Sequence, residues 1–280
     1  MIAKGLRRSI PYIVLTVLTL PIVIFYGWLL VSSFATRMHG IRPLGFTLEN
    51  WRFLAGWGEA WHRDFPSIWM ATLNTLIFAA VVTMAEVSVS AAAGYALSRL
   101  RFPGRRNFLG LTLVLHGFPG VSLLIAIFFI LRFMKLYDTM LGVILVKMSM
   151  DLPFGIWIMK GFFDTVSWDI EMSALIDGCS RLRTWLQIVL PLIRPGVAAL
   201  SIFCFLSGWQ EFLLPYIFTL SFNNWTLSVL LKRLIGDFRF VDYGLVTAVG
   251  LFYMMPVVIF YAFTQQYLLS IYTGGMKGGA

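Results

Sequence analysis

The chain has 280 residues, of which 59% are hydrophobic and only 12% are charged, and its formal net charge is +9. Soluble domains contain about 45–50% apolar and about 25% charged residues, so the composition excludes an ordinary water-soluble fold and indicates a membrane protein. The positive charge does not indicate a nucleic-acid partner, because the basic residues lie at the ends of apolar runs and not on one polar domain.

Six apolar runs are long enough to cross a membrane, because a transmembrane helix needs about 20 residues. The predicted spans are 11–34, 67–97, 108–131, 139–162, 196–220 and 243–267. Within the third run, the segment 116–120 (His-Gly-Phe-Pro-Gly) predicts a local kink. We therefore predict an all-α polytopic membrane protein with six transmembrane helices in a single domain over residues 1–280.

The first run, 11–34, follows a basic tail with Lys4, Arg7 and Arg8, which is also the pattern of a secretory signal peptide. The apolar region of a signal peptide has about 7–15 residues. This run is well beyond that length, so we expect a retained helix in preference to a cleaved signal.

The distribution of basic residues predicts the orientation. Three lie within 4–8 and four within 99–106, whereas the short loops on the opposite side mix basic with acidic residues. Loops rich in Lys and Arg face the cytoplasm, so both termini are predicted to be cytoplasmic. The long segment 35–66 is then outside, and its tryptophans suit a structure at the lipid headgroups: Trp51, Trp57 and Trp61.

Several polar side chains fall inside the predicted spans, where they are energetically expensive and often functional. They are Glu86, Lys147, Asp151, and the consecutive Trp209, Gln210 and Glu211. One interpretation is that they line a translocation path and bind a hydroxylated solute, aided by Trp209. The other is intramembrane pairing, such as Glu86 with Lys147, which neutralises both charges. Pairing is the preferred interpretation for Glu86, Lys147 and Asp151.

The stretch "ALIDGCSRLRTWLQIVLPLIRP" (174–195) differs from the apolar runs around it. Its apolar residues recur at helical spacing on both sides of Asp177-Gly178, a pair typical of turns, and Pro191 ends the second helix. The pattern predicts two short amphipathic helices joined by a sharp turn. Such helices either rest on the lipid surface or dock on another protein.

The loop 166–191 resembles the EAA loop of ABC importer permeases, whose pattern is E-A-A, three residues, Gly, nine residues and I-x-L-P. The matching positions are Ser173, Ala174, Gly178, Ile188, Leu190 and Pro191. Met172 stands where the motif has its glutamate. Glu171 is one residue earlier, which corresponds to about 100° around the helix.

The resemblance extends along the chain through "FTLENW" (46–51), "LNTLI" (73–77), "GYALSRLRFPGRR" (94–106), "GWQEFLLP" (208–215) and the tail "YTGGMKGGA" (272–280). Together these identify the chain as similar to the second permease subunit (MalG-like) of maltose-type, type I ABC importers. The resemblance implies a transport subunit in a bacterial inner membrane that carries a sugar or polyol.

The resemblance also implies partners: a second, homologous permease (MalF-like), two ATPase subunits and an extracytoplasmic substrate-binding protein. The EAA helix would dock in a groove on one ATPase. The residues expected to carry this coupling are Glu171, Ser173, Ala174, Asp177, Gly178, Leu182, Trp185, Ile188, Leu190 and Pro191. Leu182 and Trp185 would be the apolar knobs, while Arg181 and Arg183 either pair with the ATPase or anchor the loop at the membrane. The tail 268–280 either reaches the ATPases or frays.

Other functions are compatible with six helices, including an ATP-independent secondary transporter, a channel subunit or a membrane enzyme. The sequence contains no Walker A loop and no His-Glu-x-x-His motif, so we expect no catalytic residues, no cofactor and no metal, and ATP hydrolysis by a separate chain. Lys147 is the sole intramembrane cation that a phosphorylated solute would favour, and an uncharged polyhydroxyl solute is therefore preferred.

Overall fold

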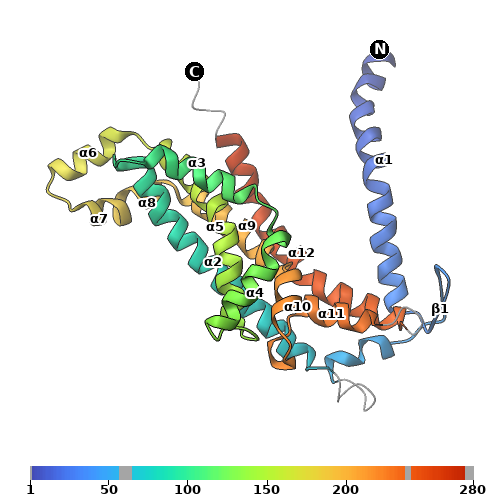
Figure 1. The fold of residues 1–280 in the computed structure, drawn as a ribbon. Helices are drawn as coiled ribbons and strands as arrows, with labels where there is room; N and C mark the ends of the chain where they lie inside the picture. The colour runs from blue at the N-terminus through green and yellow to red at the C-terminus, as the bar shows by residue number, and fades with distance from the viewer. Residues whose placement is uncertain (1, 57–64, 237–240, 275–280) are drawn as a thin grey trace. The chain divides into compact units, whose positions relative to one another are not determined.

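The computed structural model describes residues 2–56, 65–236 and 241–274, with side chains for 11–56, 65–236 and 241–265. The first elements are α1 (Ile2–Ser33), β1 (Arg37–His39), β2 (Arg42–Leu44), the 3₁₀ helix η1 (Glu49–Leu54) and α2 (Ile68–Arg99). Next come α3 (Arg105–His116), the 3₁₀ helix η2 (Gly120–Leu123), α4 (Leu124–Phe133) and α5 (Met140–Asp164). Elements α6 to α12 follow in the same chain order (Figure 1).

The chain divides into two compact units, residues 1–68 with 230–256, and residues 69–229 with 257–280. In the first unit, β1 and β2 form an antiparallel hairpin in which Arg37 pairs with Leu44. Asn50 donates from Nδ2 to the carbonyl oxygens of Ser33 and Ala35 (3.1 and 2.9 Å), which ties η1 to the end of α1. The hairpin is an addition to the predicted all-α fold. Trp51 stacks on Phe34, whereas Trp57 and Trp61 lie outside the described residues.

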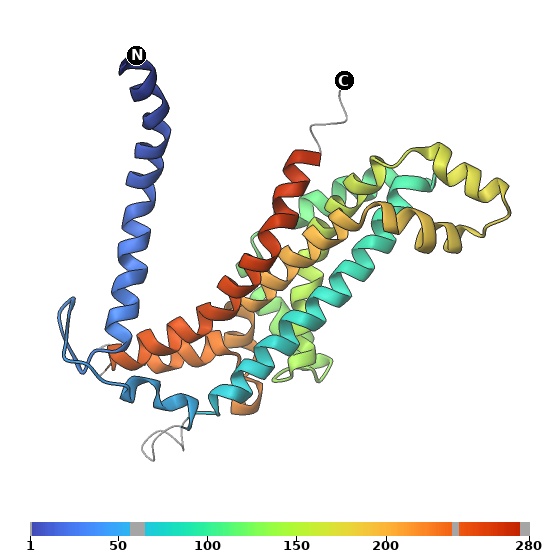
Figure 2. The ribbon, with the colours of Figure 1, turned by 180° about the vertical axis from the view of Figure 1, so that it is seen from behind.

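In the second unit, α5 packs against α3, α9 (Arg194–Trp209) and α10 (Leu213–Phe218) (Figures 1 and 2). One apolar cluster joins α2, α5 and α10 through residues that include Phe78, Val143 and Phe218. A second cluster includes Tyr95, Met159, Phe163, Val189 and Leu200. The second cluster joins α2, α5 and α9 to the segment that precedes α9, and it fixes that segment on the helical bundle.

Among the described residues, four helices are long and apolar enough to cross a membrane, or up to six if each of two bent helix pairs counts as one span. The single-helix spans are α1, α2, α5 and α12 (Tyr243–Gly274). The predicted helical architecture is thus confirmed. The helix predicted from residue 243 continues to Gly274 instead of ending at 267, and residues 275–280 of the predicted tail lie outside the described residues.

The predicted span 108–131 is bent by 91° between α3 and the segment Gly120–Phe133. The bend falls at Gly117–Pro119, inside the predicted kink. Proline has no N–H to continue a helix, and it disfavours the helical conformation of the residue before it. The kink is therefore a break.

The predicted span 196–220 is also interrupted. Residues Gln210–Phe212 separate α9 from α10. Pro215 cannot donate a hydrogen bond to the carbonyl oxygen of Glu211 four residues earlier. Ser228 in α11 (Leu227–Ile235) supplies the donor instead, from Oγ at 2.8 Å. At its start, α9 forms a bent helix pair with the segment Arg181–Leu192, at an angle of 78°.

Helices α2 and α5 approach closely where the sequence has glycine. A Cβ added at Gly94 would lie 2.8 Å from the backbone nitrogen of Lys160 and 2.8 Å from Cβ of Met159. Gly155 of α5 likewise lies against the side chain of Ser90. Small residues let transmembrane helices pack with their backbones close together, so these positions set the spacing of α2 and α5.

We expect Gly94→Ala to destabilise the protein by about 1–3 kcal/mol, the usual cost of overpacking, seen as a lower midpoint of thermal unfolding in detergent. Gly161→Ala is the matched control, because it lies in α5 with no atom within 4 Å of the added Cβ. Equal midpoints for the two variants would contradict the close packing.

Candidate functional site

The loop 166–192 has the predicted arrangement of two helices around a turn. Helix α6 (Trp168–Ile176) starts at Ser167, whose Oγ accepts a hydrogen bond from the backbone N–H of Asp169. Gly178 has φ +87°, a conformation that favours glycine. The turn predicted at Asp177-Gly178 is confirmed, and the chain re-enters a helix at α7 (Arg181–Thr184).

The second arm of the loop is not a regular α-helix. Trp185–Val189 forms a π-helical turn (η3) that leads into the short α8 (Leu190–Leu192). Pro191 cannot donate to the carbonyl oxygen of Gln187, and its ring crowds that oxygen. A widened turn relieves this crowding.

A buried ion pair anchors the loop. Glu171 is fully buried, and its Oε1 accepts a hydrogen bond from the hydroxyl of Tyr95 at 2.5 Å. Arg99 Nε lies 2.9 Å from Oε2 of the same carboxylate. Tyr95 and Arg99 are four residues apart on α2 and therefore share one face of that helix. Both oxygens of Glu171 thus face α2.

Arg99 also holds the end of α5. Its Nη2 donates to the carbonyl oxygens of Phe163 and Val166 at 3.0 and 2.7 Å, and its guanidinium lies 5.4 Å from the centre of the Trp168 ring. One arginine therefore links the ends of α2 and α5 to α6. Neither Tyr95 nor Arg99 was among the predicted site residues. The sequence signal that was available is the four-residue spacing of Tyr95 and Arg99, together with Glu171, a glutamate to which the sequence analysis assigned no partner.

The predicted coupling residues divide into an inner and an outer set. Ala174 and Glu171 are buried and Met172 is half-buried, whereas Ser173 and Gly178 are exposed. The apolar side chains on the outer face include Ile176 (83% exposed), Leu182 (63%) and Leu186. Asp177 is also exposed, and Ile188, Leu190 and Pro191 are half-buried.

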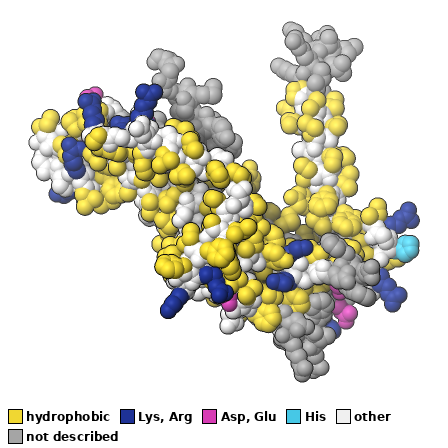
Figure 3. Space-filling model, in the orientation of Figure 1, with side chains coloured by type: hydrophobic (Ala, Val, Ile, Leu, Met, Phe, Trp, Pro, Cys, Tyr) yellow, Lys and Arg dark blue, Asp and Glu magenta, His cyan; other side chains and the backbone are white. Residues whose placement is uncertain are grey.

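Trp185 does not project as the predicted knob. It is half-buried, with its ring tilted against Tyr95 at 5.8 Å between centroids. Arg181 and Arg183 are exposed, and Arg183 Nε donates to Oε1 of Gln187. Basic side chains gather at this end of the second unit, next to hydrophobic side chains over its helices (Figure 3). The outer face is therefore apolar with a basic rim.

The intramembrane charges pair differently from the prediction. Lys147 Nζ lies 3.0 Å from Oδ2 of Asp151 and 2.8 Å from Oε2 of Glu211. The predicted Glu86–Lys147 pair is wrong, because the break after Trp209 brings Glu211 to the lysine. Trp209 is 2% exposed and stacks on Phe205, so it lies in the core of the chain. Gln210 is exposed at the break.

Comparison with known proteins shows to which family a chain with this architecture belongs. Residues 87–270 match the family of binding-protein-dependent transport system inner membrane components. The chain belongs to this family. It is the permease subunit of a binding-protein-dependent ABC importer, and not itself a catalyst.

The permease is similar to the inner membrane ABC transporter permease YcjP of Escherichia coli (33% identity over 73% of each chain). It is also similar to the maltodextrin transport system permease MdxG of Bacillus subtilis (30% identity over 99% of this chain and 98% of that protein). Its fold resembles a chain of a bacterial ABC transporter that imports alginate (TM-score 0.80, 20% identity, covering 95% of this chain and 97% of the other).

Removing the buried glutamate should loosen the loop. We expect Glu171→Ala to destabilise the permease by about 3–5 kcal/mol, because it leaves Arg99 buried without its anion. The readouts are thermal unfolding and the rate of protease cleavage at 177–180. The control is Glu49→Ala, which removes an exposed pair with Arg52; such pairs contribute little. Unchanged unfolding and cleavage in Glu171→Ala would contradict the anchor.

The cluster formed by Lys147, Asp151 and Glu211 gives a second prediction. Lys147→Met leaves Asp151 and Glu211 without their cation and should lower the yield of folded permease. Adding Asp151→Asn and Glu211→Gln to Lys147→Met should restore it, because no uncompensated charge then remains in the cluster. Size-exclusion profiles in detergent measure both. Rescue by Glu86→Gln alone would instead support the pair predicted from the sequence.

Proposed function

We propose that this permease carries an uncharged carbohydrate or polyol into a bacterial cell, powered by a separate ATPase. The family's dependence on binding proteins and the similarity to a maltodextrin permease support a sugar-like solute. Lys147 forms ion pairs with two carboxylates. This supports an uncharged solute, because a phosphorylated solute would need a free cation. Both termini and the loop 166–192 face the cytoplasm in this proposal.

The observation that carries the proposal is the contrast between the two faces of the loop. Its inner face is held by the buried Glu171–Arg99 pair, while Ile176, Leu182 and Leu186 on its outer face are exposed. In the proposed mechanism the outer face fills an apolar groove on the ATPase. Because Arg99 joins the loop to α2 and α5, closure of the ATPase dimer around ATP moves these helices together.

The proposed assembly contains this permease, a second homologous permease (MalF-like), two ATPase subunits and an extracytoplasmic substrate-binding protein. ATPase closure draws the cytoplasmic faces of the two permeases together and opens the path outward. The binding protein then delivers the solute from outside. Arg181 and Arg183 are placed by this proposal at the rim of the ATPase groove, where acidic side chains would pair with them.

The first experiment is a pull-down of the tagged permease from its host in mild detergent, with mass spectrometry of the proteins recovered. We expect a Walker-motif ATPase and a second permease, and ATP-dependent uptake of maltotriose, trehalose or glycerol when the assembly is reconstituted in liposomes. A permease that is recovered alone and transports solute without ATP would favour the secondary-transporter alternative.

The docking face predicts a charge effect. Leu182→Glu and Leu186→Glu should each abolish recovery of the ATPase, because a carboxylate in an apolar groove is desolvated without a partner. Leu48→Glu is the matched control, since Leu48 is as exposed as Leu182 but lies outside the loop. Equal ATPase recovery with all three variants would show that the outer face is not the docking surface.

A further inference from the structure

A cavity of about 270 Å³ lies among α2, α3, α5 and α9. Its polar lining consists of Glu86, Asp151, Ser207 and His116, and its remaining walls are Phe154, Phe203 and Cys204. Phe154, Phe203 and His116 are exposed, and the rings of His116 and Phe154 stack at 5.6 Å. Hydrogen-bond acceptors beside aromatic faces are a setting that suits hydroxylated molecules.

Glu86 has an unmet hydrogen-bonding demand. The residue is 1% exposed, it lines the cavity, and its Oε2 has no hydrogen-bond partner within the described part of the chain. Leaving a buried carboxylate oxygen unpaired is costly. Since Lys147 is engaged by Asp151 and Glu211, it is not available to satisfy this oxygen.

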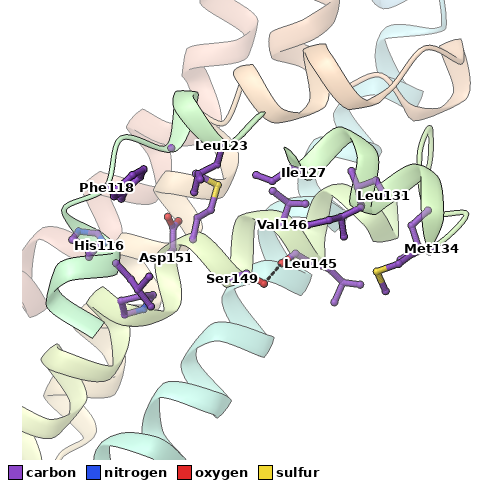
Figure 4. Close-up of a pocket in the computed structure, with 16 residues that line it drawn as sticks. His116, Phe118, Leu123, Ile127, Leu131, Met134, Leu145, Val146, Ser149 and Asp151 are labelled. Atoms are coloured by element: carbon purple, nitrogen blue, oxygen red, sulfur yellow. Dashed lines mark hydrogen bonds between the residues drawn. The ribbon is translucent and has the colours of Figure 1, made fainter. Parts of the chain in front are cut away.

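Asp151 offers a second acceptor. Its contacts with Lys147 (3.0 Å) and with the hydroxyl of Ser207 (3.3 Å) both use Oδ2. Asp151 and His116 also line a larger, mainly apolar cavity of about 680 Å³ (Figure 4). The acidic cavity therefore adjoins a space large enough for a small solute, since ligand sites have volumes of about 300–1,000 Å³.

The local charge is unbalanced towards negative. Two carboxylates, Asp151 and Glu211, share one lysine, and a third, Glu86, lines the neighbouring cavity. The two cavities that contain Asp151 and His116 are lined by no lysine or arginine among the described residues. A cavity lined by one sign of charge and low-dielectric walls concentrates ions of the opposite sign and repels those of its own.

We propose that the cavity at Glu86, Asp151 and Ser207 is a contact site for the hydroxyl groups of the solute in transit, and that its carboxylates exclude anionic sugars. The proposal rests on the proposed transport function and assigns part of the selectivity to the permease itself. Hydroxyl groups of a neutral sugar donate to Glu86 and Asp151, and the sugar's apolar face packs on Phe154. A carboxylate or phosphate on the solute would meet repulsion without a compensating cation.

The test uses the assembled importer in detergent, without ATP, with a single cysteine at the cavity: Ser207→Cys in a Cys179→Ser, Cys204→Ser background. Its thiolate attacks a methanethiosulfonate reagent, forming a mixed disulfide and releasing methanesulfinate. The rates for the trimethylammonium-ethyl and sulfonato-ethyl reagents are each divided by their rates with free 2-mercaptoethanol. We expect a normalised ratio of about tenfold or more in favour of the cation.

The variants Glu86→Gln and Asp151→Asn should each lower this ratio, whereas Glu49→Gln, which removes a carboxylate elsewhere, should leave it unchanged. Solutes are added in neutral and anionic pairs: glycerol with glycerol 3-phosphate, and maltotriose with trigalacturonate. At least one neutral member should slow the modification, and its anionic counterpart should not. A ratio of one or below, no slowing by either neutral solute, or equal slowing by the anionic partner would overturn the proposal.

Because modification of the thiol introduced by Ser207→Cys requires neither ATP nor transport, this result is separate from the test of the proposed function. An importer that takes up sugar with ATP but shows no cationic preference at the cavity would refute only the contact site. A permease with the expected preference but no ATPase partner would refute only the mechanism of energy coupling.

Discussion

The arrangement of the loop depends on one buried carboxylate. Glu171 lies between the hydroxyl of Tyr95 and the guanidinium of Arg99, and the same arginine binds the last carbonyl groups around the end of α5. A buried ion pair is strongly destabilised when one partner is lost. The loop therefore cannot leave α2 without exposing or stranding a charge, and its position is fixed by the chain itself before any partner binds.

Local sequence signals predicted the features that depend on local chemistry. The turn at Asp177-Gly178 follows from a glycine with positive φ, and the long helices α2, α5 and α12 follow from uninterrupted apolar runs. Hydropathy did not predict that the helices end near Pro119 and Gln210, because the apolar composition continues through both positions whereas the helix does not. The prolines were visible, but whether a proline kinks or ends a helix depends on donors such as Ser228, which are distant in sequence.

The candidate site residues show the same limit. The exposed position of Leu182 agrees with its predicted role, but that of Trp185 does not, because Tyr95 covers its ring. Pairing of Lys147 with Asp151 follows from their spacing on one helix face. Its pairing with Glu211 required the break after α9. Contacts between segments far apart in sequence thus determine the positions of Trp185 and Glu211, which the periodicity of single helices left open.

Because the loop is anchored within the chain, folding and docking depend on different faces of the loop. Folding depends on the face that carries Glu171 and Ala174, whereas the opposite face, with Ile176 and Leu182, makes little contact within the chain. Its sequence is thus free to diverge without loss of the fold. Exchanging only these outward residues between related permeases would then direct one permease to the ATPase subunits of another transporter. Hybrid importers could be built in this way from subunits that did not evolve together.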